Sequence, residues 1–443
     1  MTTKRSAYEL SESQVTTPET IVTLFWRLTR ERRQDLDRVL DLGAGDCRFG
    51  QEGSFHRYVG VEIDRSRSYG AKLPQNGRLI HNCVFRHRDS GYDACVGNPP
   101  YVRHHEIDTP WKQLAVDRFK RELGISFAQH CNLYLYFLAL ALVKTHNNGL
   151  VALVIPYEWV SRPSAKPLRN YIRKQRWNVA VYRFQKPIFK DVLTTASVTI
   201  IDKSKRERRW TYFDVTSDLK VIPRKGITES PSGVLPYTNG DEAWALRGLS
   251  PGTQKVFTLT EIERLAAGLR ATDVVPCVTT LRNVPRSLKV LSKASFKKHF
   301  VRAGAKCWLI KSDCGKVGSR LQAYLNGVRR SDRDTYTCHH QKPWYKFTAH
   351  PVPQLLVGSG FTKFGPKVII NGVGARAVGS VWGIHSTHRL PKRNLQRHLV
   401  RINIEKRVVA HAKILKKIEV KQLNTIVNRF MAKQPQYGRN RTK

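Results

Sequence analysis

Acidic residues are scarce in this sequence: its 443 residues include 34 Asp and Glu against 77 Lys and Arg, a net charge of +43. This imbalance excludes an ordinary near-neutral enzyme of small neutral metabolites and indicates a polyanionic partner. Disorder does not explain the excess, because 41% of the residues are apolar and only 25% are charged. The chain is long enough for two or three domains, each with its own core.

Long apolar runs are also missing. The longest, Leu133–Val143, has 11 residues, whereas a membrane-spanning helix needs about 20. The N-terminus lacks the basic block followed by an apolar block that marks a secretory signal. We therefore expect no membrane partner and an intracellular protein.

The eight cysteines show no CxxC spacing, and most lie in apolar strings, where a buried thiol is the plain interpretation. Cys307, Cys314, Cys338 and His339 form one group that a zinc ion could use. Its gaps of seven and 24 residues match no standard zinc knuckle. We therefore predict no metal site, with zinc at this group as the alternative that the spacing disfavours.

The first half of the sequence alternates short apolar strings with helical segments. Strings that are apolar throughout are typical of strands buried on both faces of a parallel sheet. Their alternation with helices predicts an open, doubly wound α/β fold with ligands at the carboxyl ends of the strands. The predicted strands are 38–42, 58–63, 93–97, 150–156, 178–182 and 197–201, and the predicted helices are 19–33, 110–123, 132–144 and 167–174.

The pattern changes after residue 202, where the charged segment 203–209 precedes an irregular, Gly- and Pro-rich half. We predict domains at 1–210 and 211–443, the second a basic, mixed α+β domain with a helical tail from about Leu395. The first 100 residues carry 15 basic and 13 acidic side chains, whereas residues 201–443 carry 47 and 15, a net charge of +32. This distribution predicts a catalytic module joined to a module that binds nucleic acid.

A glycine-rich loop, Asp41-Leu-Gly-Ala-Gly-Asp-Cys-Arg48, follows the first predicted strand. Gly43 and Gly45 permit a tight turn that brings the backbone close to a ligand. A dinucleotide-binding loop needs a third glycine at position 48, and a phosphate-binding P-loop needs Gly-Lys-Ser/Thr; neither is present. The loop therefore indicates a nucleoside without a pyrophosphate, with a plain tight turn as the alternative.

An acidic residue, Glu62, ends the second predicted strand about 20 residues after the glycine-rich loop. A carboxylate at this place suits a ribose diol, because it accepts hydrogen bonds from both hydroxyls. The alternative interpretation is a solvated acid at a strand end.

The segment Gly97-Asn-Pro-Pro-Tyr101 carries the strongest signal, again at the end of a predicted strand. Two prolines fix the backbone and remove neighbouring N–H groups. The side-chain oxygen of Asn98 and the carbonyl of Pro99 can then accept both hydrogens of one planar amine. Tyr101 offers a face on which the ring that bears this amine can stack.

In this order the three motifs resemble those of the S-adenosylmethionine-dependent adenine-N6 DNA methyltransferases, gamma class, the class of the TaqI enzyme. The resemblance covers residues 15–202 and extends to Thr17-Pro-Glu-Thr-Ile-Val22 and to the aromatic Phe189. It implies that Asn98, Pro99 and Tyr101 are catalytic and that Tyr101 and Phe189 stack on a flipped adenine. The residues that it implies for the cofactor S-adenosylmethionine are Thr17, Asp41, Gly43, Ala44, Gly45, Glu62, Asn82 and Asn98.

One position departs from the family pattern. Where the family usually has an acidic residue for the cofactor's adenine amine, this chain has Asn82, whose oxygen can accept the same bond without charge. Asp89 is the other candidate, and the sequence leaves the choice between them open.

The resemblance implies a cytoplasmic, monomeric enzyme of a bacterium, archaeon or phage that methylates double-stranded DNA in a restriction-modification system. No convincing Pro-Asp…Asp/Glu-x-Lys nuclease pattern is visible, so we expect a separate endonuclease chain to perform any cleavage. The alternatives are a methyltransferase for RNA base amines or protein glutamine amides, and a DNA-binding protein that has lost its activity. The basic second half argues against the former, and intact Asn98 and Tyr101 argue against the latter.

Overall fold

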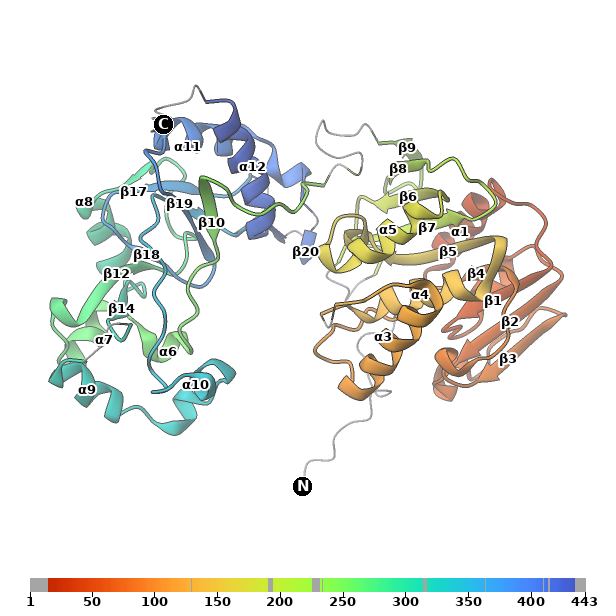
Figure 1. The fold of residues 1–443 in the computed structure, drawn as a ribbon, viewed down its shortest axis with the longest axis horizontal. Helices are drawn as coiled ribbons and strands as arrows, with labels where there is room; N and C mark the ends of the chain where they lie inside the picture. Colours follow the sequence, from red (N-terminus) through yellow and green to blue (C-terminus); the bar gives the residue numbers. More distant parts are fainter. Residues whose placement is uncertain are drawn as a thin grey trace, which may run out of the picture. The chain divides into compact units, whose positions relative to one another are not determined.

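The computed structural model describes residues 15–128, 130–189, 194–224, 232, 234–313, 317–362, 364–408, 410–412 and 415–434. The chain forms two compact units: the first extends to Val234 and includes Val409–Lys413, and the second contains Leu235–Val408 and the residues from Ile414 onward (Figure 1). This division falls 24 residues after the sequence-based boundary at 210. The charged segment 203–209 is the turn between two strands of the first unit, so it does not separate the units.

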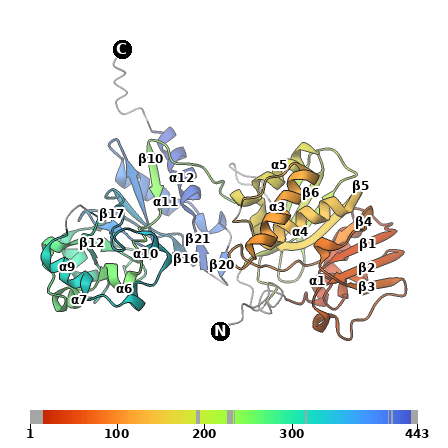
Figure 2. The ribbon, with the colours of Figure 1, turned by 60° about the horizontal axis from the view of Figure 1, so that its bottom comes forward.

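A mixed sheet forms the centre of the first unit, and within the described residues its strand order is β3-β2-β1-β4-β5-β7-β6-β8-β9. The order reverses between β1 and β4, and Figure 2 shows β3, β2, β1 and β4 side by side. The strands are β1 (Arg38–Leu42), β2 (Arg57–Glu62), β3 (Gly77–His81), β4 (Tyr92–Val96), β5 (Thr145–Pro156), β6 (Asn178–Phe184), β7 (Ala196–Asp202), β8 (Trp210–Val215) and β9 (Val221–Pro223).

The sheet is not parallel throughout, so the sequence-based expectation of a parallel sheet is wrong for part of it. Strands β3, β2, β1, β4 and β5 pair in parallel, but β7 lies between β5 and β6 and pairs antiparallel with both. The described residues of the connection from β6 to β7 contain no helix, and a parallel pair needs a longer crossover than these 11 residues. An apolar strand buried on both faces, as β7 is, does not reveal its direction from sequence.

Two layers of helices cover the sheet, so alternate residues of each central strand enter different cores. Leu153 and Ile155 of β5 pack with α3, α4 and α5, whereas Ala152 and Val154 pack with α1 and α2. The first unit is therefore a three-layer α/β/α sandwich. Its helices are α1 (Glu19–Arg30), α2 (Arg48–Glu52), α3 (Thr109–Leu123), α4 (Leu133–Lys144) and α5 (Lys166–Lys174).

The longest apolar run of the sequence forms α4, which is buried on all sides. A helix that is hydrophobic all round belongs in a core, and α4 fills the space between the sheet and α3. Across the described ranges, every helix is too short or too polar to cross a membrane.

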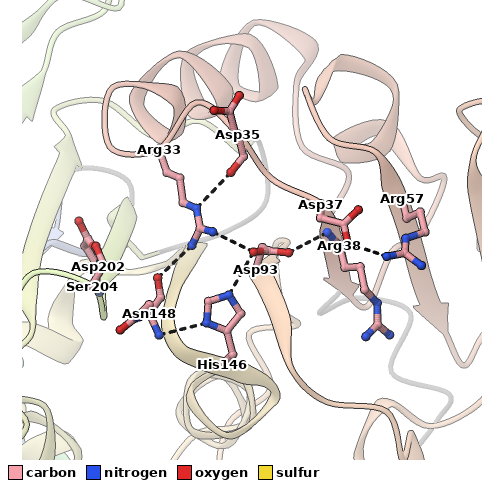
Figure 3. A network of polar contacts seen from close by, with 10 residues as sticks. All are labelled: Arg33, Asp35, Asp37, Arg38, Arg57, Asp93, His146, Asn148, Asp202 and Ser204. Carbon is pink, nitrogen blue, oxygen red and sulfur yellow. Dashed lines mark hydrogen bonds and ion pairs between the residues drawn. The ribbon is translucent and has the colours of Figure 1, made fainter.

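A polar network joins the strands at their amino ends, the edge opposite to the glycine-rich loop (Figure 3). Asp93 of β4 accepts hydrogen bonds from Arg33 Nη2 and the Arg38 backbone N–H, both at 2.9 Å, and its Oδ1 lies 3.1 Å from His146 Nε2. Burial raises the pKa of Asp93, but these bonds and the charge of Arg33 outweigh it and leave the pKa below its ordinary value. Arg33 also donates to the Asn148 carbonyl at 2.9 Å. The network ties α1, β1, β4 and β5 together at this edge.

The second unit contains smaller sheets and short helices. One sheet has the order β10-β19-β15-β17-β13, and another has the order β11-β14-β12-β18. Its strands are β10 (Ala243–Leu246), β11 (Thr258–Leu259), β12 (Val274–Val278), β13 (Val290–Leu291), β14 (Trp308–Ile310), β15 (Leu355–Gly358), β16 (Gly360–Phe361), β17 (Val368–Asn371), β18 (Arg376–Ala377), β19 (Val381–Ser386) and β21 (Leu415–Lys417). Strand β20 (Ala410–Ala412) lies in the segment that belongs to the first unit.

The C-terminal segment is not one helical tail. Helices α11 and α12 are separated by β20 and β21, and apolar side chains of α12, among them Leu423 and Val427, lie in the core with β15 and β19. The helices of this unit are α6 (Gln254–Phe257), α7 (Glu261–Ala266), α8 (Lys293–Phe296), α9 (Ser319–Asn326), α10 (Tyr336–His340), α11 (Lys392–Arg401) and α12 (Val420–Ala432).

The cysteines considered for zinc do not come together in the described part of the chain. Cys307 and Cys338 are buried in two different hydrophobic clusters, and Cys314 lies outside the described residues. No group of three or more His, Cys, Asp or Glu that could hold a metal ion occurs among the described residues.

Candidate active site

The predicted motifs meet at one edge of the first sheet, because β1, β2, β3 and β4 run parallel and end there. The glycine-rich loop follows β1, Glu62 ends β2, Asn82 follows β3, and the segment 97–101 follows β4. Together they surround a cavity of about 990 Å³. The sequence-predicted residues that line this cavity are Thr17, Gly43, Ala44, Gly45, Glu62, Asn82, Asn98, Pro99, Tyr101 and Phe189.

Two candidates lie away from the cavity wall. Asp41 is fully buried beneath the loop, and Asp89 pairs with Arg78 at 3.6 Å outside the cavity lining. Asn82 does line the cavity, although its Oδ1 accepts a hydrogen bond from the Cys83 N–H at 2.8 Å. The geometry therefore favours Asn82 over Asp89 as a ligand-contacting residue.

Glu62 fixes the glycine-rich loop against the end of β2. Its Oε2 accepts from the Gly45 N–H at 2.9 Å, and its Oε1 accepts from the Ile63 and Asp64 N–H groups, each at 2.9 Å. An ionised carboxylate offers about four lone-pair positions. Three are in use, so Glu62 can accept one ligand hydroxyl directly, where the sequence argument expected two.

The buried carboxyl of Asp41 supports the loop between β4 and Asn98. Its Oδ2 accepts from the Tyr58 hydroxyl at 2.6 Å, while its Oδ1 has no hydrogen-bond partner among the described residues. Gly97 lies over it with φ +132°, and a Cβ at this position would come within 2.8 Å of Asp41 Oδ1. Only glycine fits here, both for its positive φ and for the space.

Burial raises the pKa of Asp41 to about 7; the hydrogen bond from Tyr58 offsets only part of this rise, and the nearby charges of Glu62 and Asp46 raise the pKa further. The folded protein therefore binds a proton at pH values where the unfolded chain has lost it. The free energy of unfolding should fall as the pH rises from about 4 to about 7, and it should level off above that range.

We expect Asp41→Asn to remove roughly 4 kcal/mol of this decline, because an amide does not titrate and each unit of pKa shift corresponds to about 1.36 kcal/mol. Urea unfolding between pH 4 and pH 8 measures the effect. Asp35→Asn, at an exposed position of the same unit, is the matched control and should keep the wild-type slope. An equally steep slope in Asp41→Asn would mean that Asp41 does not carry the proton.

Asn98 is held in one orientation by the segment before α1. Its Nδ2 donates to the Val15 carbonyl at 3.2 Å and to Thr17 Oγ1 at 3.1 Å. These bonds leave Asn98 Oδ1 as a buried acceptor without a partner among the described residues, in the wall of the cavity. An unpaired buried acceptor costs free energy that a donor supplied by a ligand would recover.

Arg48 is a further functional candidate. In the sequence it only excluded a dinucleotide-binding loop, because it stands where such a loop has its third glycine. Its guanidinium donates to the Thr17 carbonyl and pairs with Asp46, and all three residues line the cavity. Thr17 is thereby connected both to the glycine-rich loop and to Asn98. No spacing in the sequence predicts this contact, because the two residues lie 31 positions apart.

Tyr101 and Phe189 come together at the cavity, but not as parallel plates. Their ring centroids lie 6.1 Å apart with an interplanar angle of 80°. The Tyr101 hydroxyl donates to the Val154 carbonyl at 3.2 Å, and burial raises the pKa of Tyr101, so the phenol stays neutral.

Two family models match the chain. The model of the Eco57I restriction-modification methylase matches residues 57–189, and that of the C-terminal domain of the Type II methyltransferase M.Eco57I matches residues 243–401. The first match contains Glu62, Asn82 and the segment 97–101, and it lies within the first unit. The second match lies within the second unit.

Two curated proteins and one solved structure resemble the chain. Type II methyltransferase M.AccI from Acinetobacter calcoaceticus is 20% identical over 345 residues, which are 70% of this chain and 62% of the relative. Type II methyltransferase M.XamI from Xanthomonas campestris pv. amaranthicola is 21% identical over 387 residues, covering 79% and 71%. The chain therefore spans less than two thirds of the length of the Acinetobacter relative.

The solved structure of the Type IIL restriction-modification enzyme MmeI, in complex with DNA, aligns with 94% of this chain and 64% of its own, with a TM-score of 0.58 at 11% identity. This likeness concerns the fold, and it confirms the expected Rossmann-like α/β sheet with a second domain. One family model matches part of the first unit and another matches part of the second, so the chain is similar to restriction-modification DNA methyltransferases in both units.

Proposed function

We propose that this protein transfers a methyl group from S-adenosylmethionine to the exocyclic N6 of an adenine flipped out of double-stranded DNA. The observation that carries the proposal is the Oδ1 of Asn98, a buried acceptor that no described residue satisfies and that faces a cavity large enough for two ligands. An amine hydrogen is the donor that this oxygen lacks. The similarity to restriction-modification DNA methyltransferases supports DNA as the substrate.

The residues present fit the cofactor. Gly45 has open space above its Cα, the remaining lone pair of Glu62 Oε2 suits a ribose hydroxyl, and apolar side chains such as Val61 and Phe137 form the wall for a purine ring. We propose that Thr17, Gly43, Ala44, Gly45, Glu62, Asn82 and Asn98 hold S-adenosylmethionine, and that Asp41 supports the loop from below. When bound, the cofactor supplies a methyl group on a positively charged sulfonium.

The chain's own contribution is to orient the acceptor amine. The lone pair of an adenine amine is delocalised into the ring, so this nitrogen is a poor nucleophile. In the proposal Asn98 Oδ1 and the Pro99 carbonyl accept the two amine hydrogens and favour a pyramidal nitrogen. The hydrogen bonds from Asn98 to Val15 and Thr17 keep the amide from rotating. Such preorganised groups are worth more in a water-excluded cavity than in solution.

Aromatic residues would hold the flipped base. Tyr101 is anchored by its hydroxyl and offers its ring face, while Phe189 meets that ring edge-on. Stacking on Tyr101 and Phe189 offsets part of the few kcal/mol that unstacking a base costs. The edge-on arrangement requires the Phe189 ring to swing aside as the base enters.

The second unit would supply most of the affinity for DNA. Residues 235–443 carry 39 Lys and Arg against ten Asp and Glu, a net charge of +29, whereas residues 1–234 carry 38 and 24. We propose that this charge binds backbone phosphates and that side chains among it contact base edges. In the same proposal the protein is a cytoplasmic monomer, the modification half of a restriction-modification system whose cleavage is performed by a separate endonuclease.

The second candidate is methylation of an RNA base amine or a protein glutamine amide, since the amine chemistry at Asn98 would be the same. The strongly basic second unit and the similarity to DNA methyltransferases disfavour it. The adenine N6, rather than another amine of DNA, follows from the resemblance of the segment 97–101 to the adenine-specific enzymes.

Tritium transfer from labelled S-adenosylmethionine to DNA, RNA and protein in parallel tests the proposal. We expect incorporation into duplex DNA alone and recovery of the label as N6-methyladenine after digestion. Single-molecule sequencing of the methylated DNA then identifies the site. Label in cytosine, RNA or protein would contradict the proposed acceptor, and absence of label from all three would contradict the activity.

A further inference from the structure

A second, smaller pocket adjoins the candidate active site. It has a volume of about 440 Å³ and is lined by His104, His105, His130 and Lys112, with the first turns of α3 as its floor. His105, Ile107 and Thr109 line both this pocket and the large cavity. The smaller pocket therefore lies at the rim of the active site, and none of the roles proposed above uses its side chains.

The three imidazoles are gathered around His104. The ring centroid of His104 lies 5.3 Å from that of His105 and 6.4 Å from that of His130, with both ring pairs nearly perpendicular. Lys112 donates from Nζ to the His104 carbonyl at 2.7 Å, and the His104 N–H donates to Asn132 Oδ1 at 3.1 Å. Both backbone polar groups of His104 are thus held, one by Lys112 of α3 and the other by Asn132 at the start of α4.

Hydrogen-bond donors outnumber acidic groups at this place. Among the described residues no carboxylate lines the smaller pocket; Glu106 pairs with His105 at 3.4 Å, and Asp108 caps α3 by accepting from the Trp111 N–H at 3.1 Å. Burial lowers the pKa of His104, and the proximity of His105, Lys112 and His130 lowers it further. An anion bound among these basic side chains would offset their mutual repulsion, because opposite charge favours the protonated imidazole.

The anion that can reach this rim follows from the geometry of a nucleotide. A base inside the large cavity stays covalently attached to its sugar, whose two phosphates must remain at the cavity mouth. We propose that the pocket formed by His104, His105, His130 and Lys112 binds a backbone phosphate of the DNA strand next to the flipped nucleotide. This inference rests on the proposed function. The pocket would bind this phosphate only after the nucleotide has flipped, since an unflipped nucleotide keeps its phosphates on the duplex surface.

Neutralising single phosphates tests the contact. Duplexes containing the methylation site carry one methylphosphonate at a time, within a few nucleotides of the target adenine on its own strand. We expect one position at which kcat/KM of the wild type falls about tenfold, the range of one charge-assisted hydrogen bond. In the double variant His104→Asn, His130→Asn, kcat/KM should be about tenfold lower on the unmodified duplex. A methylphosphonate at the sensitive position should lower it no further.

The matched control is His56→Asn, at an exposed position before β2 on the opposite edge of the sheet, which should retain the wild-type sensitivity. Two results would overturn the proposal. One is that the double variant and the methylphosphonate each lower kcat/KM independently at every position, so that their effects multiply. The other is that the double variant is as fast as wild type. If the double variant fails to fold by circular dichroism, the exposed His130→Asn alone replaces it, with a smaller expected coupling.

The same cycle separates this inference from the proposed function. If the wild type methylates no DNA, the proposed function fails, and equilibrium binding of duplexes that hold a methylphosphonate is measured by fluorescence anisotropy instead. If one methylphosphonate lowers the DNA affinity of the wild type but not that of the double variant, the phosphate-binding pocket is supported even though no methyl transfer occurs. If the two changes lower the binding free energy independently at every position, the proposed phosphate contact is overturned.

Discussion

Replacing Asn98 by alanine is expected to lower kcat for methyl transfer by roughly 10³-fold, the upper range for one preorganised polar group in an active site. The substitution removes the Oδ1 acceptor and at the same time frees the Val15 carbonyl and Thr17 Oγ1 from their donor. Steady-state transfer of labelled methyl groups to DNA measures kcat. Calorimetric titration with S-adenosylmethionine should show that the variant still binds the cofactor, with affinity reduced several-fold at most.

Two further variants distinguish catalysis from folding. Thr17→Val keeps Asn98 but removes one of the two groups that orient its amide, so we expect a smaller loss in kcat, about tenfold. Asn76→Ala, at an exposed position before β3, is the matched control and should leave kcat unchanged. Undiminished transfer by Asn98→Ala would refute the catalytic assignment, and loss of cofactor binding together with thermal stability would point to a structural role instead.

Affinity for duplex DNA should fall steeply with salt, by roughly 10³- to 10⁵-fold between 50 and 200 mM if six to ten phosphates are contacted. The reason is the net charge of +29 on residues 235–443, since each phosphate that a Lys or Arg neutralises releases a bound counterion. Fluorescence anisotropy of a labelled duplex at a series of salt concentrations gives the slope. A slope near zero would mean that the basic residues of the second unit do not contact the DNA backbone.

The cofactor provides the internal control for this measurement. The large cavity is lined by four acidic residues, Asp46, Glu62, Glu106 and Asp108, and by two basic ones, Arg48 and Arg67. This excess of two negative charges is small beside the +29 of residues 235–443, so the cofactor's affinity should change far less than that of DNA over the same salt range. Equal salt dependence of cofactor and DNA would contradict the proposed division of labour between the two units.

The strand ends of the first unit could be predicted because their chemistry is local. Three motifs after apolar strings predicted the edge at which Gly45, Glu62 and Asn98 meet, and all three line one cavity. Each of these residues lies at the end of its strand or at most three residues after it, so knowing the strand is enough to place the residue. The prediction also extended to Thr17 and Phe189, through the family resemblance.

The features that escaped prediction depend on contacts between distant residues. The direction of β7, the bond from Arg48 to the Thr17 carbonyl and the burial of Asp41 under Gly97 leave no spacing in the sequence. The cluster of His104 with His130 likewise joins the loop after β4 to the segment before α4, 26 positions further on. In the second unit the strands are mostly two to six residues long, too short for a periodic pattern to identify them.

The reversal of strand order between β1 and β4 divides the candidate active site into two sides. Strands β1, β2 and β3 carry the loops proposed to hold the cofactor, and they lie on one side of the reversal. The loop after β4, which contains Asn98 and His104, opens toward the other side. If the proposed function holds, insertions or replacements after residue 101 would change the methyl acceptor and leave the backbone of Gly43–Gly45 unchanged. A new target specificity would then require new loops on one side of the reversal only, while the loops that hold the methyl donor stay the same.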